Sequence, residues 1–205
     1  MHIFGICGGS GSGKGTACAF FSELGIPSID TDKVYREMTA GKSDCLDELV
    51  DAFGPDVLLP DGSLDRRRLA AIVFADTEDG LALKGKLEAI THKHILKKTR
   101  DLIRDYEEEG APAVLIDAPL LFESRFNEEC EKTIAVIASE GTRIKRIMQR
   151  DSISEEAARA RILSQIPDDT LVKTCDYVIR NDGRTDQLRC EVQKLFGALL
   201  NEKII

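Results

Sequence analysis

The feature that most constrains the fold of this chain is a glycine-rich segment near its N-terminus. Residues 8–16 read GGSGSGKGT and lie between an apolar run, residues 2–7, and a helical pattern that begins at Lys14. Gly8, Gly13 and Lys14 match the phosphate-loop pattern G-x-x-x-x-G-K-[ST]. In such a loop backbone N–H groups converge on phosphate oxygens, and the positive end of the following helix adds to the attraction. The segment therefore predicts a nucleotide-phosphate site; a flexible glycine turn with a surface lysine is the alternative.

The loop departs from the pattern at one position. Gly15 stands where a serine or threonine hydroxyl is expected, and Thr16 follows one residue later. That hydroxyl normally helps to hold Mg²⁺. The form G-K-G-T also occurs in small-molecule kinases similar to adenylate kinase. The departure therefore indicates either a kinase variant or a nucleotide-binding site that has lost catalysis.

Short apolar runs recur along the chain and alternate with helical patterns, which is typical of a parallel sheet with helices on both faces. Residues 33–103 interrupt this alternation with helical patterns and turns but no convincing strand. We expect an α/β P-loop nucleoside triphosphate hydrolase fold with a parallel five-stranded sheet, a helical insertion and a helical lid. The expected strands are residues 2–7, 27–30, 113–117, 133–137 and 177–179, and the expected flanking helices are residues 14–24, 142–150, 154–165 and 186–200.

The composition is that of a globular protein. With 205 residues, of which 42% are hydrophobic, the chain can form one domain with a single core. Its net charge of −8 argues against broad nucleic-acid binding, because a phosphate backbone requires a basic face. Its 6 cysteines are scattered, which favours free buried thiols over disulfides or zinc. Without a signal-peptide pattern or a bilayer-length apolar run, we expect a cytoplasmic protein with no nucleic-acid or membrane partner.

Carboxylates follow two of the expected strands. Asp30 and Asp32 follow the second strand, at the edge where parallel sheets bind ligands. Asp32 could take the proton of an attacking hydroxyl or hold Mg²⁺ through water, but it is an equally good N-cap for a helix beginning at Lys33. Asp117 ends the third strand, where a Walker-B aspartate would lie near Mg²⁺; a loop-entry aspartate is the alternative.

Basic residues gather on one expected helix. Arg143, Arg146 and Arg150 are spaced i, i+3 and i+7 and share a helix face. Guanidinium groups there could neutralise charge on a transferring phosphoryl group, although taken alone the stripe is better explained as a solvated basic face. His92 and His94 are two residues apart in a helical pattern, so they point apart and do not predict a zinc site.

Seven segments of the chain together resemble one family. In order they read GICGGSGSGKGT, LGIPSIDTD, FGPDVLLPDGSLDRRRL, ITHKHI, DAPLLFE, RIMQRD and ARILSQIPDDTLVKTCDYVIRNDG. Their order and spacing are similar to those of the dephospho-coenzyme A kinases over nearly the full length. A phosphate loop alone is shared by many unrelated proteins, whereas this ordered set is far more specific.

The resemblance implies that a monomer or small homo-oligomer transfers the γ-phosphate of ATP, with Mg²⁺, to the 3′-hydroxyl of 3′-dephospho-coenzyme A. It implies that Lys14 carries the principal charge, that Asp32 is the general base and that Arg146 is the lid arginine. The implied nucleotide contacts are Ser10, Gly11, Ser12, Gly13, Lys14, Gly15, Thr16, Arg150 and Asn181; the implied acceptor contacts are Asp32, Arg66, His92 and Asp117; the implied Mg²⁺ ligands are Thr16 and Asp32.

The resemblance also implies a division into parts. The nucleotide-binding core would comprise residues 1–32, 92–141 and 166–205, the helical acceptor-binding domain residues 33–91, and the lid residues 142–165.

Two positions depart from the family pattern. Gly15 replaces the usual hydroxyl residue, which puts Mg²⁺ coordination there in question, and Lys93 replaces the proline that usually follows His92. A nucleoside monophosphate kinase is the nearest alternative interpretation. A guanine-nucleotide switch is a further one, but the sequence lacks the N-K-x-D segment that reads guanine.

Overall fold

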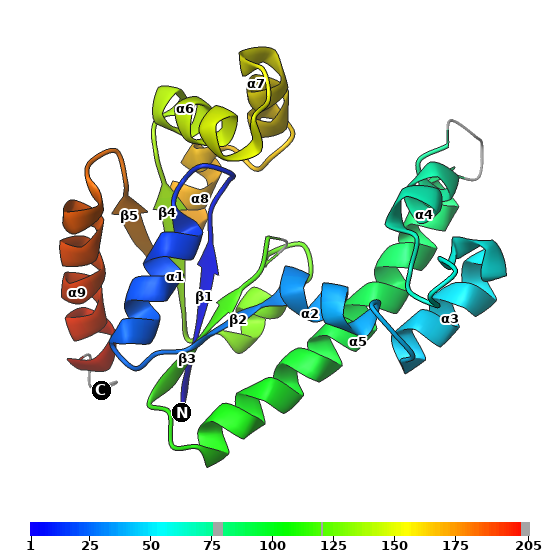
Figure 1. Ribbon diagram of the computed structural model, residues 1–205. Coiled ribbons are helices and arrows are strands. Elements are labelled where there is room, and N and C mark those ends of the chain that lie inside the picture. Colours follow the sequence, from blue (N-terminus) through cyan, green and yellow to red (C-terminus); the bar gives the residue numbers. More distant parts are fainter. Residues whose placement is uncertain (76–79, 120, 202–205) are drawn as a thin grey trace. The chain divides into compact units, whose positions relative to one another are not determined.

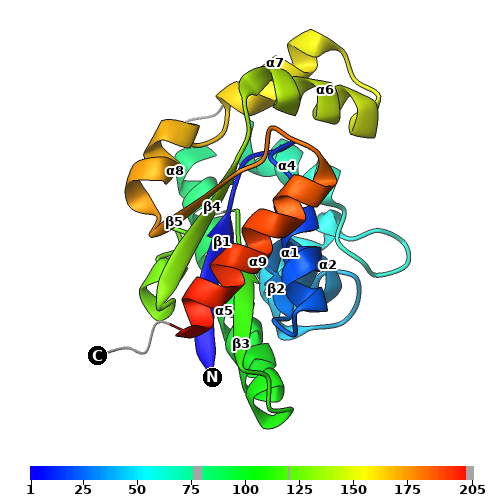
Figure 2. The same ribbon diagram turned by 90° about the vertical axis from the view of Figure 1, so that its left-hand side faces the viewer.

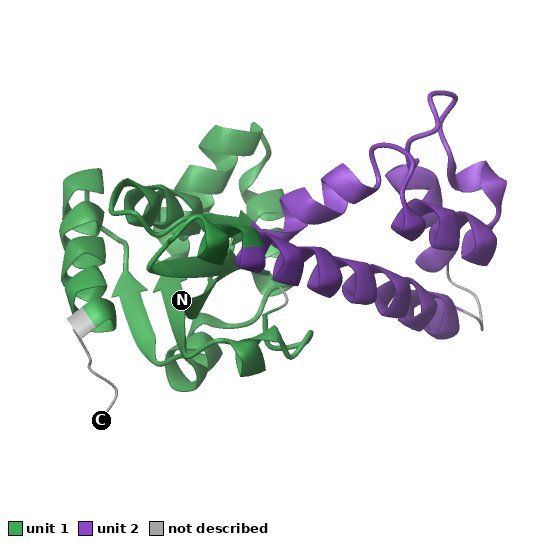
Figure 3. Ribbon diagram, turned by 90° about the horizontal axis from the view of Figure 1, so that it is seen from below, with its two compact units in different colours: residues 1–29, 105–205 green, residues 30–104 purple. Residues whose placement is uncertain are grey.

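The computed structural model describes residues 1–75, 80–119 and 121–201. They form two compact units, one made of Met1–Ile29 and Asp105–Ile205 and the other of Asp30–Arg104 (Figure 3). The first unit carries a β-sheet and the second is helical. In the described part of the chain no helix is long and apolar enough to cross a membrane.

The first unit is built on a parallel five-stranded sheet with the strand order β2-β3-β1-β4-β5 (Figure 1). The central strand β1 pairs in parallel with β3 and β4, and Ile6 lies opposite Asp117 in the register. All five strands were expected, because strands buried on both faces read as continuous apolar runs. The strands are β1 His2–Cys7, β2 Ser28–Asp30, β3 Ala113–Asp117, β4 Lys132–Ile137 and β5 Tyr177–Arg180.

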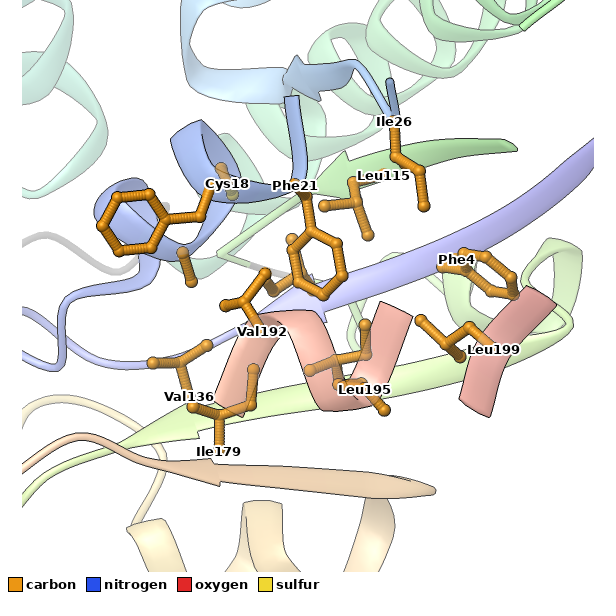
Figure 4. Close-up of a cluster of buried hydrophobic side chains, with 14 of the residues drawn as sticks. Phe4, Cys18, Phe21, Ile26, Leu115, Val136, Ile179, Val192, Leu195 and Leu199 are labelled. Carbon is orange, nitrogen blue, oxygen red and sulfur yellow. The ribbon is translucent and has the colours of Figure 1, made fainter. Parts of the chain in front are cut away.

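Helices α1 (Lys14–Glu23) and α9 (Thr185–Asn201) pack together over one face of the sheet (Figure 2). Figure 4 shows the core beneath them, in which Phe21 of α1 and Val192 of α9 meet sheet residues such as Phe4. Each of these side chains is buried, and burial of a large apolar side chain stabilises a fold by roughly 1.5–3 kcal/mol. This core holds β1 and α1, and therefore the loop between them, in place.

The residues expected to form a lid lie in two helices, α6 (Glu140–Asp151) and α7 (Glu155–Leu163). The two helices pack through a small cluster of their own that includes Ile147 and Ala158. Ser152 ends α6 in the left-handed conformation with φ 53°, and the chain then enters α7. Both helices were expected from the sequence.

A third helix in this part of the chain was not expected. Helix α8 (Asp168–Thr174) follows Pro167, which occupies its N-cap position. Its seven residues are too few to show a helical period, so the sequence offered no pattern to recognise. A 3₁₀ turn, Phe126–Glu129, precedes β4.

The second unit has its own hydrophobic core, formed by buried residues of α3, α4 and the turn between them, among them Leu49, Val57 and Leu69. The helical character expected for residues 33–103 is confirmed in their described part, where the one β feature is an isolated bridge between Leu58 and Leu64. The elements are α2 Thr31–Met38, α3 Asp44–Phe53, the 3₁₀ turn Pro55–Val57, α4 Arg66–Val73 and α5 Gly80–Glu108.

The boundaries of this unit differ from the expected residues 33–91. Helix α5 continues without a break through His92, and the compact unit ends only at Arg104. Residues 92–104 therefore lie outside the sheet-bearing unit to which the sequence assigned them. Because a continuous helix crosses the expected boundary, composition alone could not place it.

Candidate active site

The phosphate loop joins the end of β1 to the start of α1, and its glycines are required by close neighbours. Gly13, the N-cap of α1, has φ 94°, and a Cβ there would lie 2.0 Å from Asn181 Nδ2. Gly11 has φ 78°, and a Cβ there would lie 2.7 Å from the backbone oxygen of Arg143. Only glycine accepts both the left-handed backbone and the close approach. The loop leads into the positive end of α1, an arrangement suited to phosphate.

Lys14 and Asp117 meet beside this loop. Lys14 is the first residue of α1, and its Nζ forms an ion pair with Asp117 Oδ1. Asp117 ends β3 opposite Ile6 of β1, and the Sγ of Cys18 lies 3.8 Å from its Oδ2. Both charged side chains are largely buried, which strengthens their attraction. The structure thus brings together two charges that the sequence suggested separately.

Gly15 is not required by packing. It is the second residue of α1, it is exposed, and a Cβ at this position would meet nothing within 4 Å. Thr16 follows it in the first turn of α1 and is also exposed. A serine would therefore fit at position 15 without displacing a neighbour.

Arg146 and Asn181 bind the loop through its carbonyl groups. Arg146 Nη1 donates to the backbone oxygens of Asn181 at 3.0 Å and Gly11 at 3.2 Å. The buried Asn181 donates from Nδ2 to the backbone oxygen of Ser12 at 2.7 Å. The interpretation of the arginine stripe as a solvated face is therefore wrong for Arg146, because the loop supplies acceptors that the sequence did not reveal. Arg150, by contrast, is exposed.

In the second unit Asp32 is not the N-cap of α2, which was one of the two interpretations of this residue from the sequence. Asp30 is the N-cap of α2, and its Oδ1 accepts a hydrogen bond from the backbone N–H of Lys33 at 3.0 Å. Asp32 lies inside the first turn, is exposed, and has no side-chain hydrogen bond to any described residue. The N-cap interpretation of Asp32 is therefore wrong by two residues, and its carboxylate is not committed to the helix.

Two further expected acceptor contacts, Arg66 and His92, lie in the second unit, whereas the fourth, Asp117, belongs to the first unit. Arg66 Nη2 donates to Thr39 Oγ1 at 2.9 Å, and its guanidinium carbon lies 5.7 Å from the ring centroid of Tyr35. His92 lies half-buried on α5. Lys93, in the position of the family's proline, bonds from Nζ to Glu48 Oε1 at 2.6 Å, which fits a helix that continues through this point.

Comparison with known proteins decides the family. The family model described as dephospho-CoA kinase matches residues 2–187, which is most of the chain. The chain belongs to the dephospho-CoA kinase family. The dephospho-CoA kinase of Corynebacterium glutamicum is 36% identical over 201 residues, which cover 98% of each chain.

Two solved structures are similar to the chain over nearly its whole length, and one of them carries the name dephospho-CoA kinase. TT1252 from Thermus thermophilus superposes with a TM-score of 0.79 at 31% identity over 97% of each chain. The dephospho-CoA kinase from Campylobacter jejuni superposes with a TM-score of 0.70 at 29% identity over 98% of each chain. The P-loop α/β fold expected from the sequence is confirmed, as is the resemblance on which it rested.

In this member of the dephospho-CoA kinase family, the first part of the loop is held by side chains for which the sequence predicted no contact with the loop. The side chains of Arg143 and Gln165 both bind Ser10, and Asp168 binds Arg143. Arg143 belonged to the arginine stripe and Gln165 to the segment ARILSQIP, so each carried a signal. The sequence did not predict that both side chains bind the same loop residue, Ser10.

The groups around the loop of this dephospho-CoA kinase family member fit Mg²⁺ bound with a nucleotide. Hard divalent cations prefer oxygen ligands. Of the three candidate ligands from the sequence, the Thr16 hydroxyl and the Asp117 carboxylate belong to the first unit near the loop, and the implied ligand Asp32 belongs to the second unit. The Oγ of Ser12 is fully buried and has no hydrogen-bond partner within the described residues, so the loop contains a polar atom that its own chain leaves unsatisfied. No group of three or more potential protein ligands, as a self-sufficient metal centre would need, occurs in the described ranges.

Proposed function

We propose that this chain transfers the γ-phosphoryl group of ATP to the 3′-hydroxyl of the ribose of 3′-dephospho-coenzyme A, giving ADP and coenzyme A. The observation that carries the proposal is the glycine loop between β1 and α1 with Lys14 at its end and Asp117 beside it. Membership of the dephospho-CoA kinase family supports the choice of acceptor.

Lys14 has two states in this proposal. In one state its ammonium group forms the ion pair with the Asp117 carboxylate. When ATP binds, Lys14 exchanges that partner for oxygens of the β- and γ-phosphates and follows the negative charge as it moves to the leaving group. Backbone N–H groups within Gly11 to Thr16 bind the remaining phosphate oxygens.

Asp32 takes the proton of the attacking hydroxyl. The 3′-oxygen forms a bond to the γ-phosphorus, the bond from that phosphorus to the leaving oxygen of ADP breaks, and the hydroxyl proton passes to the Asp32 carboxylate. The exposure of Asp32 and its freedom from helix capping support this role. Arg66 and His92 then contribute to binding the acceptor in the second unit.

Arg146 offsets charge on the transferring group, with Arg150 in support. The position of Arg146 on the carbonyl groups of the phosphate loop supports a role close to the nucleotide. Mg²⁺, held through Thr16 and Asp32, would neutralise phosphate charge when bound. Asn181 is the remaining nucleotide contact in the proposal, and its side-chain amide donates a hydrogen bond to the backbone oxygen of Ser12 in the loop.

Purified protein with ATP, Mg²⁺ and dephospho-coenzyme A tests the proposal in an assay that couples ADP formation to NADH oxidation. We expect dephospho-coenzyme A to be the preferred acceptor over AMP and other nucleoside monophosphates. Preference for a monophosphate would instead identify a nucleoside monophosphate kinase. ATP binding without turnover of any acceptor would identify a site that has lost catalysis.

Two substitutions test the assigned residues. We expect Lys14→Ala and Asp32→Asn each to lower kcat by at least about 100-fold, because one removes charge stabilisation and the other the proton acceptor. Lys145→Ala and Asp47→Asn are matched controls, since both residues are exposed on helices of the same units. Near-normal turnover in either test variant would remove the role assigned to that residue.

A further inference from the structure

Ser10, in the first half of the phosphate loop, is held by three side chains that we call the Ser10 clasp: Arg143, Gln165 and Asp168. Arg143 comes from the first turns of the lid helix α6, Gln165 follows α7, and Asp168 begins α8. The clasp therefore joins the loop to both ends of the lid.

Every hydrogen-bonding group of Ser10 is bound by the clasp. Its backbone N–H donates to Gln165 Oε1 at 3.0 Å, and its backbone oxygen accepts from Arg143 Nε at 2.9 Å. Its hydroxyl accepts from Gln165 Nε2 at 3.1 Å. The Ser10 N–H is committed to Gln165, and the Ser12 N–H donates to the backbone oxygen of Gly9 at 3.1 Å, so neither of these two loop N–H groups is open to a phosphate oxygen.

The clasp also braces the loop on both sides of Ser10. A Cβ at Gly9 would lie 2.1 Å from Arg143 Nη2, and a Cβ at Gly11 would lie 2.9 Å from Arg143 Cα. The loop is thus packed against one arginine along three consecutive residues. A change in the position of Arg143 must therefore move the loop or leave a gap beside it.

Arg143 itself is fixed in place. It is 3% exposed, and its guanidinium donates to Asp168 Oδ1 at 3.0 Å and to Gln165 Oε1 at 2.6 Å in addition to Ser10. Burial raises the pKa of the Asp168 carboxyl, and the nearby Arg143 partly offsets that rise. A buried guanidinium with three oriented acceptors has little freedom, because breaking any contact leaves a polar group unsatisfied.

We propose that Arg143 and Gln165 are positioning residues that hold Ser10, and through it the phosphate-binding backbone of Gly11 to Lys14, in the geometry that receives ATP. Neither residue touches the phosphates; their effect is to remove the cost of ordering the loop when the nucleotide arrives. The inference rests on the proposed kinase activity, but its direct consequence concerns nucleotide affinity and can be measured separately.

The test compares Arg143→Lys and Gln165→Met with the wild-type protein. Lysine keeps the positive charge but not the planar fork that binds three acceptors, and methionine keeps the length of the glutamine without its amide. We expect KM for ATP to rise by about 10-fold or more in each variant, with KM for dephospho-coenzyme A within about 2-fold of wild type. Arg159→Lys is the matched control, because Arg159 is an exposed lid arginine paired with Glu155.

Calorimetric titration with a non-hydrolysable ATP analogue provides the second measurement. A weakened Kd in the two variants but not in Arg159→Lys would support the inference, even if dephospho-coenzyme A proved not to be the acceptor. The inference would be overturned if both variants kept the wild-type Kd and KM for the nucleotide and showed only a lower thermal unfolding midpoint. The clasp would then have a structural role alone.

Ser10→Ala covers the case in which the larger changes prevent folding. It removes only the hydroxyl contact and keeps the two backbone contacts of Ser10. We expect a rise in KM for ATP of about 2- to 5-fold, because one neutral hydrogen bond contributes on the order of 1 kcal/mol. No change in nucleotide affinity for this folded variant would count against the clasp.

Discussion

Gly15 occupies the second position of α1, where the structure leaves open space around its missing side chain. We expect Gly15→Ser to lower the half-saturating Mg²⁺ concentration of the kinase reaction by about 5-fold, the equivalent of roughly 1 kcal/mol, because it adds an oxygen ligand where the phosphate-loop pattern has one. Titration of Mg²⁺ at saturating ATP in steady-state assays measures this.

Gly15→Ala separates the hydroxyl from the effect on the helix. Alanine at this position should stabilise α1 by about 0.4–1 kcal/mol without supplying a ligand. If both variants shift the Mg²⁺ dependence equally, the hydroxyl is not responsible. If neither does, Thr16 or water already completes the coordination of the metal.

Residue-level chemistry was predictable where the pattern is local. Glycines between a strand and a helix, and a lysine at the end of the loop, indicate phosphate binding without knowledge of the tertiary structure. The capping of α2 by Asp30 in place of Asp32 depends on where the helix begins, which sequence fixes only to within a few residues. The burial of Arg143 depends on partners outside its own helix, and charged residues are rarely buried without such partners.

At the scale of elements, Asp151 links the helices α6 and α7. Its carboxylate pairs with Arg150, its neighbour on α6, at 2.8 Å and with Arg161 on α7. The pKa of Asp151 is lowered from 3.8 to about 2, first by the hydrogen bond from Arg150 and then by Arg161. A carboxyl with a lowered pKa stabilises the folded state at pH above its unfolded value, and this contribution disappears as the pH falls through its folded value.

Asp151→Asn should therefore lower the thermal unfolding midpoint by about 1–3 °C at pH 5–7, a small effect because the pair is near the surface. The difference from wild type should shrink between pH 3.8 and about 2 and vanish below that range. Circular dichroism melts of both proteins across this interval measure it. A difference that is constant with pH would mean that the charge of Asp151 does not join α6 to α7.

Helices and strands were predicted correctly where their buried residues form a long apolar run or helical period in the sequence. The strands of the sheet and helices α1, α6, α7 and α9 all appear in the sequence as apolar runs or helical periods. Helix α8 has only seven residues, and its identity is set by Pro167 and by packing of Leu171. The end of the helical unit was not predictable because α5 runs through it without a change of pattern.

At the scale of the molecule, each unit has its own core. Leu49 is 0% exposed within the core of the second unit, and Ile134 is 0% exposed within the core of the first. We expect Leu49→Ala to lower the free energy of unfolding of the second unit by about 2–5 kcal/mol. Hydrogen exchange measured by mass spectrometry should then show faster exchange in α3 and α4, with β1 and β4 still protected.

Ile134→Ala provides the converse comparison, because it should speed exchange in the sheet before it affects α3. Equal acceleration in both units by either variant would show instead that the chain unfolds as a single cooperative block. The comparison thus establishes whether acceptor binding and nucleotide binding, as proposed, depend on separately stable parts.

The central place of β1 in the sheet has a consequence for the synthesis of the protein. Residues 2–7 leave the ribosome long before their pairing partners β3 and β4, which extend over residues 113–117 and 132–137. An apolar strand must therefore wait unpaired until most of the chain has been translated, and pairing over such sequence separations is slow. During that interval we expect the emerging chain to depend on chaperones, and chains truncated before residue 137 to aggregate when expressed.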